Sequence, residues 1–242
     1  MRRVLILGGT AEATALARAL AGHDVVTSLA GRTDTVPDIP GTVRVGGFGG
    51  PDGLTAYLQA EGIGAVIDAT HPFAARISAA AEQACTRIGI PRLALVRPGW
   101  QRQPGDRWTE VDSTAKAAET LPAIGRRAFL TVGIQEIGAF SNVRGVWMLV
   151  RLLAAQDLPL ADYRVVTGRP PFGEDDEAAL MRTHGIDVLV SKASGGSATS
   201  AKIAAARRLG LPVLMIRRPE PPAGDQATDV AAALTWLDRL WS

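Results

Sequence analysis

Residues 4–14, Val-Leu-Ile-Leu-Gly-Gly-Thr-Ala-Glu-Ala-Thr, constrain the fold of this 242-residue chain more than any other segment. The branched apolar run predicts a buried strand, and Gly8-Gly9 permits a tight reversal of the backbone. Thr10 can cap the helix that follows, and the N–H groups at such a helix start bind phosphate. The full G-x-G-x-x-G fingerprint is absent, because Ala13 stands near the place of the third glycine. The segment is therefore either a nucleotide-binding turn or a purely structural one.

Strand and helix patterns alternate along the chain, which implies parallel sheets with right-handed crossovers. Strands are predicted at 3–7, 24–29, 43–46, 65–69, 92–96, 128–132, 146–150, 164–167, 187–190 and 212–216. Helices are predicted at 11–21, 51–61, 73–88, 114–123, 135–140, 174–184, 199–209 and 227–241. Residues 98–107 break the alternation and indicate an interdomain connection. We expect an α/β protein of two Rossmann-like halves, 1–98 and 99–242, with mainly parallel sheets and a ligand cleft between them.

Composition excludes several classes of protein. No apolar run approaches membrane-spanning length, and the apolar stretch at the N-terminus ends at a glycine turn, so a cytoplasmic protein without a membrane partner is expected. The sequence contains a single cysteine, Cys85, so an internal disulfide is excluded, and the position of Cys85 predicts a buried thiol. Three scattered histidines indicate no metal site. No dense basic run with interleaved aromatic residues is present, which argues against nucleic acid, while 23 of the 26 basic residues are Arg, a side chain suited to carboxylates and phosphates.

Residues 28–34, Ser-Leu-Ala-Gly-Arg-Thr-Asp, follow the second predicted strand. Dinucleotide-binding proteins place their ribose-reading residue here, about 20 residues past the glycine turn. Arg32 and Thr33 suit the 2′-phosphate of NADP, whereas Asp34 would suit the ribose of NAD. The segment favours NADP, with a solvated loop arginine as the alternative.

Residues 68–74, Asp-Ala-Thr-His-Pro-Phe-Ala, close the fourth strand, and Pro72 is expected in the first turn of the next helix. Thr70 can bond a ligand hydroxyl or amide, and His71 can donate to a phosphate or carboxylate. The alternative for His71 is a helix cap. Asp68 lies inside an apolar strand, which favours a structural role.

A second strand-turn-helix segment, with a turn rich in Gly and Ser, follows the strand predicted at 187–190. Its amides, its hydroxyls and the two ammonium groups of Lys192 and Lys202 predict an anion site, although it is no P-loop because Gly-Lys-Ser/Thr is missing. The alternative is a flexible turn. The candidate substrate- or phosphate-binding residues are Ser191, Lys192, Ser194, Gly195, Gly196, Thr199 and Lys202.

Taken in order, these segments resemble the precorrin-6A reductases of cobalamin biosynthesis over nearly the whole chain. The matching strings are residues 6–12, 28–32, 68–74 and 191–195, followed by Lys202-Ile203 and Arg218-Pro219. The string Asp68 to Ala74 is the most specific. The chain departs from the family pattern with Pro170-Pro171-Phe172 and Glu177, which leaves the role of residues 170–177 open.

The resemblance implies a reductase that delivers hydride from NADPH to a ring double bond of precorrin-6A, a polycarboxylated tetrapyrrole, and gives precorrin-6B. His71 and Lys192 are candidate proton donors, with water and the substrate itself as alternatives. The candidate cofactor-binding residues are Gly8, Gly9, Thr10, Ala11, Glu12, Arg32, Thr33, Thr70 and His71.

Two other functions are compatible with a glycine-rich start. One is a non-catalytic nucleotide-sensing module in which both turns hold a ligand that controls a partner. The other is a short-chain-dehydrogenase-like oxidoreductase. Against the second, no Tyr-x-x-x-Lys pair is present, because Tyr57 and Tyr163 are followed four residues later by Glu61 and Thr167.

Overall fold

The computed structural model describes residues 2–31 and 38–242, and the chain divides into two compact units. The first unit comprises Met1–Pro98 and Pro219–Ser242, and the second comprises Gly99–Arg218. Each unit contains one six-stranded sheet in which every paired strand is parallel. The predicted α/β fold with parallel sheets is therefore confirmed.

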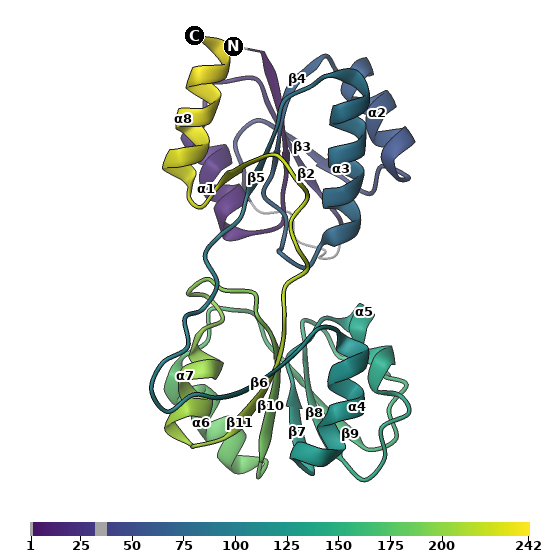
Figure 1. Ribbon diagram of the computed structural model, residues 1–242, viewed down its shortest axis with the longest axis vertical. Helices are drawn as coiled ribbons and strands as arrows, with labels where there is room; N and C mark the ends of the chain where they lie inside the picture. Colours follow the sequence, from purple (N-terminus) through teal and green to yellow (C-terminus); the bar gives the residue numbers. More distant parts are fainter. Residues whose placement is uncertain (1, 32–37) are drawn as a thin grey trace. The chain divides into compact units, whose positions relative to one another are not determined.

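Sheet A, in the first unit, has the strand order β12-β5-β4-β1-β2-β3. Its strands are β1 (Arg3–Leu7), β2 (Val25–Leu29), β3 (Thr42–Val45), β4 (Ile63–Asp68), β5 (Arg92–Leu95) and β12 (Asp225–Ala227). Helices α1 (Ala11–Ala19) and α8 (Val230–Trp241) lie on one face, and α2 (Pro51–Ala60) and α3 (Ala75–Ile88) on the other (Figure 1). Alternate residues of β1 enter the two cores, with Ile6 packed in the core of α1 and α8 and Leu5 in that of α2 and α3.

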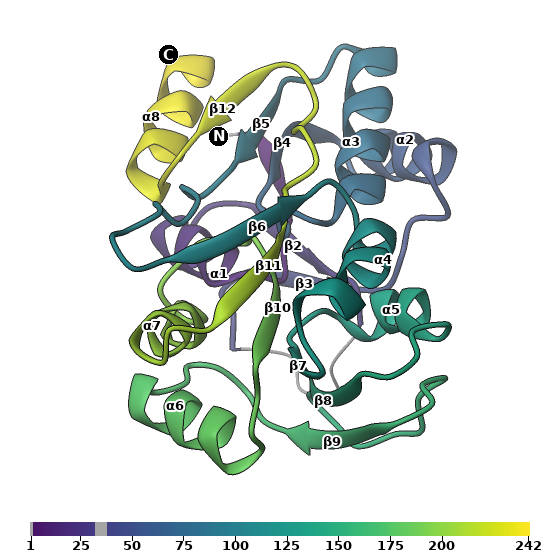
Figure 2. The same ribbon diagram turned by 60° about the horizontal axis from the view of Figure 1, so that its bottom comes forward.

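Sheet B, in the second unit, has the order β6-β11-β10-β7-β8-β9. Its strands are β6 (Arg107–Val111), β7 (Arg127–Leu130), β8 (Trp147–Leu152), β9 (Tyr163–Thr167), β10 (Val188–Lys192) and β11 (Pro212–Ile216). Figure 2 shows α6 (Glu174–Thr183) and α7 (Ala201–Arg208) on one side of this sheet, and α4 (Thr114–Ile124) and α5 (Ile134–Ile137) on the other. A short 3-10 helix, η1 (Gly138–Phe140), continues α5 and contacts α4.

The two sheets have the same arrangement but take their sixth strand from different places in the chain. In sheet A the strand beside β5 is β12, the last strand of the chain, whereas in sheet B the strand beside β11 is β6, the first strand of its unit. The second unit is thus an insertion between β5 and β12. Residues 219–242 belong to the first unit, so the expected assignment of 99–242 to one half is wrong. The physical reason is burial, because Ala233 and Leu237 of α8 pack in the core of sheet A.

Each predicted strand and helix is present within a few residues of its expected bounds, and two strands were missed. These are β6 and β12, both at sheet edges, and most of their residues are exposed. Pro72 precedes α3 rather than entering its first turn, since residues 71–74 form a turn closed by the Ala74 N–H and the His71 carbonyl at 2.7 Å. Cys85 is buried as expected, and burial raises the pKa of its thiol to about 11. Within the described residues, no helix combines the length and apolar character that crossing a membrane requires.

Leu237→Ala tests whether α8 is part of the first unit's core. Leu237 is fully buried, so its truncation should lower the free energy of unfolding by about 2 to 5 kcal/mol. Leu240 is 37% exposed on the same helix, and Leu240→Ala should cost less than about 1 kcal/mol. Denaturant unfolding of both variants measures the difference, and equal effects would show that α8 is not packed as described.

Candidate functional site

The glycine turn of sheet A is shaped by two different constraints. A Cβ at Gly8 would lie 3.1 Å from the Thr27 methyl group and 3.3 Å from the Ser28 carbonyl oxygen, so the turn packs directly on β2. Gly9 has a φ of +106°, and the described residues leave open space within 4 Å of where its Cβ would be. The turn therefore needs glycine at position 8 because of close packing and at position 9 because of the positive φ. Its open side presents backbone that a ligand can approach.

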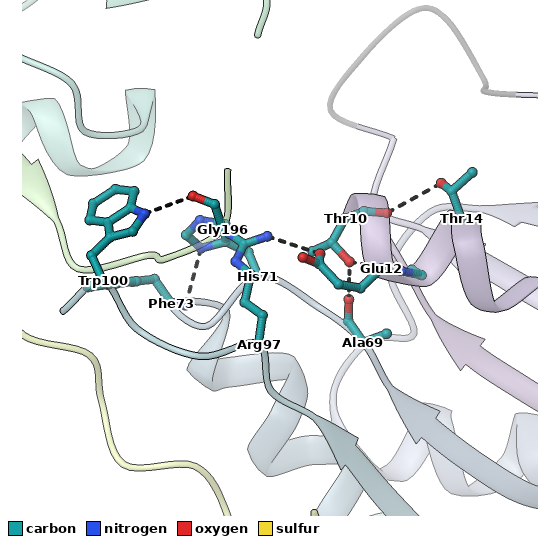
Figure 3. A network of polar contacts seen from close by, with 10 residues as sticks. Thr10, Glu12, Thr14, Ala69, His71, Phe73, Arg97, Trp100 and Gly196 are labelled. Atoms are coloured by element: carbon teal, nitrogen blue, oxygen red, sulfur yellow. Dashed lines mark hydrogen bonds and ion pairs between the residues drawn. The ribbon is translucent and has the colours of Figure 1, made fainter. Parts of the chain in front are cut away.

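Thr10 fixes the start of α1 with one hydroxyl group (Figure 3). Its Oγ1 accepts from the Ala13 N–H at 3.1 Å, as expected of an N-cap, and donates to the Ala69 carbonyl at 2.7 Å. The second bond joins the start of α1 to the segment after β4. The N–H groups of Ala11 and Glu12 belong to the first turn of α1, where a helix supplies no acceptor of its own, so this turn can receive an anion.

The side chains after β4 are partly committed to the protein. The Asp68 carboxylate, 5% exposed, accepts from the Thr70 N–H at 3.2 Å and from the Thr70 hydroxyl at 2.7 Å. Asp68 is structural, as expected, and the Thr70 hydroxyl proton points to it rather than to a ligand. His71 Nδ1 accepts from the Phe73 N–H at 3.2 Å, so a neutral His71 ring carries its proton on Nε2. The other polar group of the His71 ring is then this Nε2–H.

Arg32 and Thr33, predicted to read the 2′-phosphate, lie outside the described residues. Beside the end of β2 the structure places an arginine that the sequence did not indicate, Arg44 of β3. Its guanidinium donates to the Ser28 hydroxyl at 3.4 Å and lies over the Phe48 ring at 3.9 Å. Arg44 also donates to the carbonyls of Gly46 and Gly47, so it fixes the backbone beside the end of β2.

Arg97, just beyond β5, was also missed. One of its guanidinium nitrogens lies 3.1 Å from a carboxylate oxygen of Glu12 in the first turn of α1 (Figure 3). The two residues are 85 positions apart in the sequence, and no local pattern links them. The expected cofactor residue Glu12 therefore has a cation as its partner.

The Gly- and Ser-rich turn after β10 is confirmed as a strand-turn-helix element, with α7 beginning at Ala201. Gly195 and Gly196 both have positive φ, +62° and +78°, which explains why glycine stands at both positions. The Trp100 indole N–H donates to the Gly196 carbonyl at 2.8 Å, a contact within the second unit that the sequence did not predict. Ser191 is fully buried and its hydroxyl donates to the Lys192 carbonyl at 3.3 Å, so it faces the protein.

Charged side chains gather where β8 and β10 end and α6 and α7 begin. Glu177 of α6, only 1% exposed, pairs with both terminal nitrogens of Arg151 on β8. Lys192, for which the sequence gave no partner, forms an ion pair with Glu136 at 2.5 Å. This cluster of Glu136, Arg151, Glu177, Lys192 and Lys202 carries three cations against two carboxylates, an excess of positive charge that suits an anionic ligand.

Lys202 is the buried member of this cluster, with 8% of its surface exposed in the first turn of α7. Burial lowers the pKa of its ammonium to about 8 from an ordinary value of 10.5. The Glu177 carboxylate opposes this shift, while the cations Arg151 and Lys192 add to it. The Trp100 ring lies 5.8 Å from the Lys202 ammonium and covers it. Lys192 and Lys202 are thus brought together as the sequence predicted.

A pocket of about 280 Å³ lies beside this cluster in the second unit. Its apolar walls include Trp100, Trp108 and Met215, and its lining includes the arginines Arg217 and Arg218. Arg218 donates to the Ala193 carbonyl at 2.6 Å, which joins the pocket to the turn after β10. The lining also contains the carboxylate of Glu110, so two arginines stand against one acidic residue. Apolar walls with this excess of positive charge suit a flat apolar ligand that carries carboxylates.

Lys202→Met tests the electrostatic account of the cluster. Because the pKa of Lys202 is lower in the folded protein, the unfolded chain binds more protons between pH 8 and 10.5, and stability is lost as the pH falls through this range. The variant should therefore be more stable than the parent at pH 7, by about 1 to 3 kcal/mol, and the gain should shrink toward pH 10. Chemical denaturation at several pH values measures it. Lys116→Met, at an exposed lysine, is the control, and a destabilised Lys202→Met protein at pH 7 would contradict the account.

Comparison with known proteins gives consistent results over the whole chain. Residues 3–238 match the family described as "Precorrin-6x reductase CbiJ/CobK". The chain is 50% identical over 246 residues to a precorrin-6A reductase of Rhodococcus erythropolis, with 99% of both chains covered. It is 29% identical over 260 residues to a cobalt-precorrin-6A reductase of Salmonella typhimurium, covering 98% of this chain and 96% of that one. A solved structure named "CobK precorrin-6A reductase" superposes with a TM-score of 0.93 at 43% identity, covering 99% of this chain and 97% of that one.

Proposed function

Because the chain belongs to the precorrin-6x reductase CbiJ/CobK family, we propose that it reduces a ring double bond of precorrin-6A, giving precorrin-6B, with NADPH as the reductant. The observation that carries the proposal is 50% identity to a precorrin-6A reductase over 99% of both chains. As a member of this family the chain is an oxidoreductase. We place the reaction in the cytoplasm, which stays a prediction.

The first unit fits a dinucleotide. Sheet A has the strand order of dinucleotide-binding folds, with its glycine turn directly after the central strand β1. The open backbone at Gly9 and the first turn of α1 would receive the pyrophosphate, and Arg32 and Thr33 the 2′-phosphate of NADPH. When bound, NADPH supplies the hydride for the reduction. The protein's task at this site is to hold the cofactor and exclude water.

The second unit fits a polycarboxylated substrate. Lys192 and Lys202, with the amides of residues 194–196, would bind substrate carboxylates, because the cluster around them has one cation more than its carboxylates neutralise. The pocket at Trp100 and Trp108 would hold an apolar edge of the tetrapyrrole.

One proton must accompany the hydride. His71 and Lys192 stay the candidate donors, Lys192 through the ammonium that Glu136 holds in place and His71 only as an imidazolium, which would give up the contact between its Nδ1 and the Phe73 N–H. The ion pair favours a binding role for Lys192, because the Glu136 contact fixes the position of its charge.

The direct test is consumption of NADPH by the purified protein with and without precorrin-6A. Oxidation should require the tetrapyrrole. Lys192→Ala should raise KM for precorrin-6A about tenfold with little change in kcat, because one charge-assisted contact is lost. Lys116→Ala, which removes an exposed lysine paired with Glu119, should leave both constants unchanged. No oxidation by the parent protein would refute the proposed function, and identical kinetics for the two variants would remove the turn after β10 from the substrate site.

Cofactor preference tests the assignment of Arg32. Arg32→Glu should weaken NADPH binding by at least about tenfold, because the 2′-phosphate loses a cation and meets a carboxylate. NADH lacks that phosphate and serves as the matched control ligand, with an expected change below about threefold. Fluorescence titration of the reduced nicotinamide measures both. Equal weakening of the two dinucleotides, or of neither, would show that Arg32 does not read the 2′-phosphate.

A further inference from the structure

Arg97 is a partly buried cation at the edge of sheet A where the proposed cofactor site lies. It follows β5 by two residues, and β5 pairs with β4, which in turn pairs with β1. Because the strands are parallel, the carboxyl ends of β1, β4 and β5 share one edge. The topology therefore brings Arg97 to the same edge as the glycine turn, although nearly ninety residues separate them along the chain.

One partner of Arg97 stands on the element proposed to bind phosphate. Glu12 lies in the first turn of α1, and its carboxylate oxygen is 3.1 Å from an Arg97 nitrogen. Both side chains are largely shielded, with 16% of Arg97 and 25% of Glu12 exposed. A cation shielded in this way needs an anionic partner, and Glu12 supplies one. The negative charge of Glu12 lies at the N-terminal end of α1, and this end of a helix also favours a phosphate.

The neighbouring backbone leaves room for a second anion. The open space at Gly9 adjoins the first turn of α1, while the Thr10 hydroxyl is fixed by Ala13 and Ala69. A pyrophosphate at this turn would lie against the same helix start as Glu12. Two anions would then compete for one guanidinium, whose planar fork suits phosphate oxygens.

We propose that Arg97 binds the pyrophosphate of the dinucleotide and that Glu12 is the counter-ion it exchanges for that pyrophosphate. The inference rests on the proposed cofactor site and adds two roles to it. Arg97 supplies the cation that holds the part common to NADPH and NADH. Glu12 keeps Arg97 paired when no dinucleotide is bound, at a cost in affinity.

If Glu12 and the pyrophosphate exchange on Arg97, substitutions of Glu12 and of Arg97 should change the affinity for dinucleotides in opposite directions. Arg97→Met should weaken NADPH and NADH equally, by about 10- to 100-fold, since both contain the pyrophosphate. Glu12→Gln should tighten both by at least about threefold, because the competing carboxylate is gone. In an Arg97→Met background the effect of Glu12→Gln should fall below about twofold, because no cation is left to release.

The experiment is a fluorescence titration of NADPH and NADH with the parent, the two single variants and the double variant. Adenosine 2′-monophosphate, which has no pyrophosphate, is titrated by calorimetry and should bind the parent and Arg97→Met equally. Arg87→Met, which breaks an exposed ion pair with Asp52 in the same unit, is the matched control and should bind like the parent. Thermal unfolding without ligand shows that each variant is folded.

Three results would overturn the inference. One is parent-like binding by folded Arg97→Met. Another is weaker dinucleotide binding by Glu12→Gln, as expected of a purely structural ion pair. The third is a gain from Glu12→Gln that persists without Arg97, which would mean simple repulsion. If Arg97→Met does not fold, the neutral Arg97→Gln replaces it in the single and double variants, and the same three results decide. Failure of the parent to bind any dinucleotide would instead refute the proposed cofactor site.

Discussion

Parallel strand pairing is the constraint on which both units depend. Each strand of a parallel sheet must be followed by a crossover, so all the carboxyl ends of one sheet meet at one edge. In sheet A this edge collects the glycine turn after β1, the segment after β4 and Arg97 after β5. In sheet B it collects Arg151 near the end of β8, Lys192 at the end of β10 and the start of α7. Residues with proposed chemical roles are thus gathered by topology rather than by sequence proximity.

We propose that the same arrangement serves two different ligands because the local charge differs. At sheet A the Glu12 carboxylate balances the Arg97 cation, and the open backbone at Gly9 offers N–H groups rather than side chains. At sheet B the buried ammonium of Lys202 adds a charge that the pairs Arg151–Glu177 and Lys192–Glu136 do not neutralise. A dinucleotide needs backbone donors and one cation, whereas a substrate with several carboxylates needs an excess of cations.

The sequence predicted what depends on neighbouring residues. Apolar runs located the interior strands, and Thr10 caps α1 as expected, with its hydroxyl accepting from the Ala13 N–H at 3.1 Å. The edge strands β6 and β12 were missed because exposed strands lack an apolar run. The return of residues 219–242 to the first unit could not be foreseen either, because it depends on which core buries α8.

The sequence also did not reveal which charged residues form ion pairs when the two residues lie far apart along the chain. Glu136 lies 56 positions from Lys192, and Glu12 lies 85 positions from Arg97. A single sequence shows which residues carry charge, but the pairing is set by the sheet that brings the strand ends together. The sequence thus located both turns but missed the groups that balance their charge.

We infer that the glycine turn of sheet A holds the cofactor and that the turn of sheet B holds the substrate. A crystal structure of the protein with bound NADP⁺ tests it most directly. We expect the pyrophosphate at the backbone of Gly9 and Thr10, with the Arg97 guanidinium turned from Glu12 to a phosphate oxygen. A pyrophosphate bound instead at residues 194–199, against Lys192 and Lys202, would contradict it.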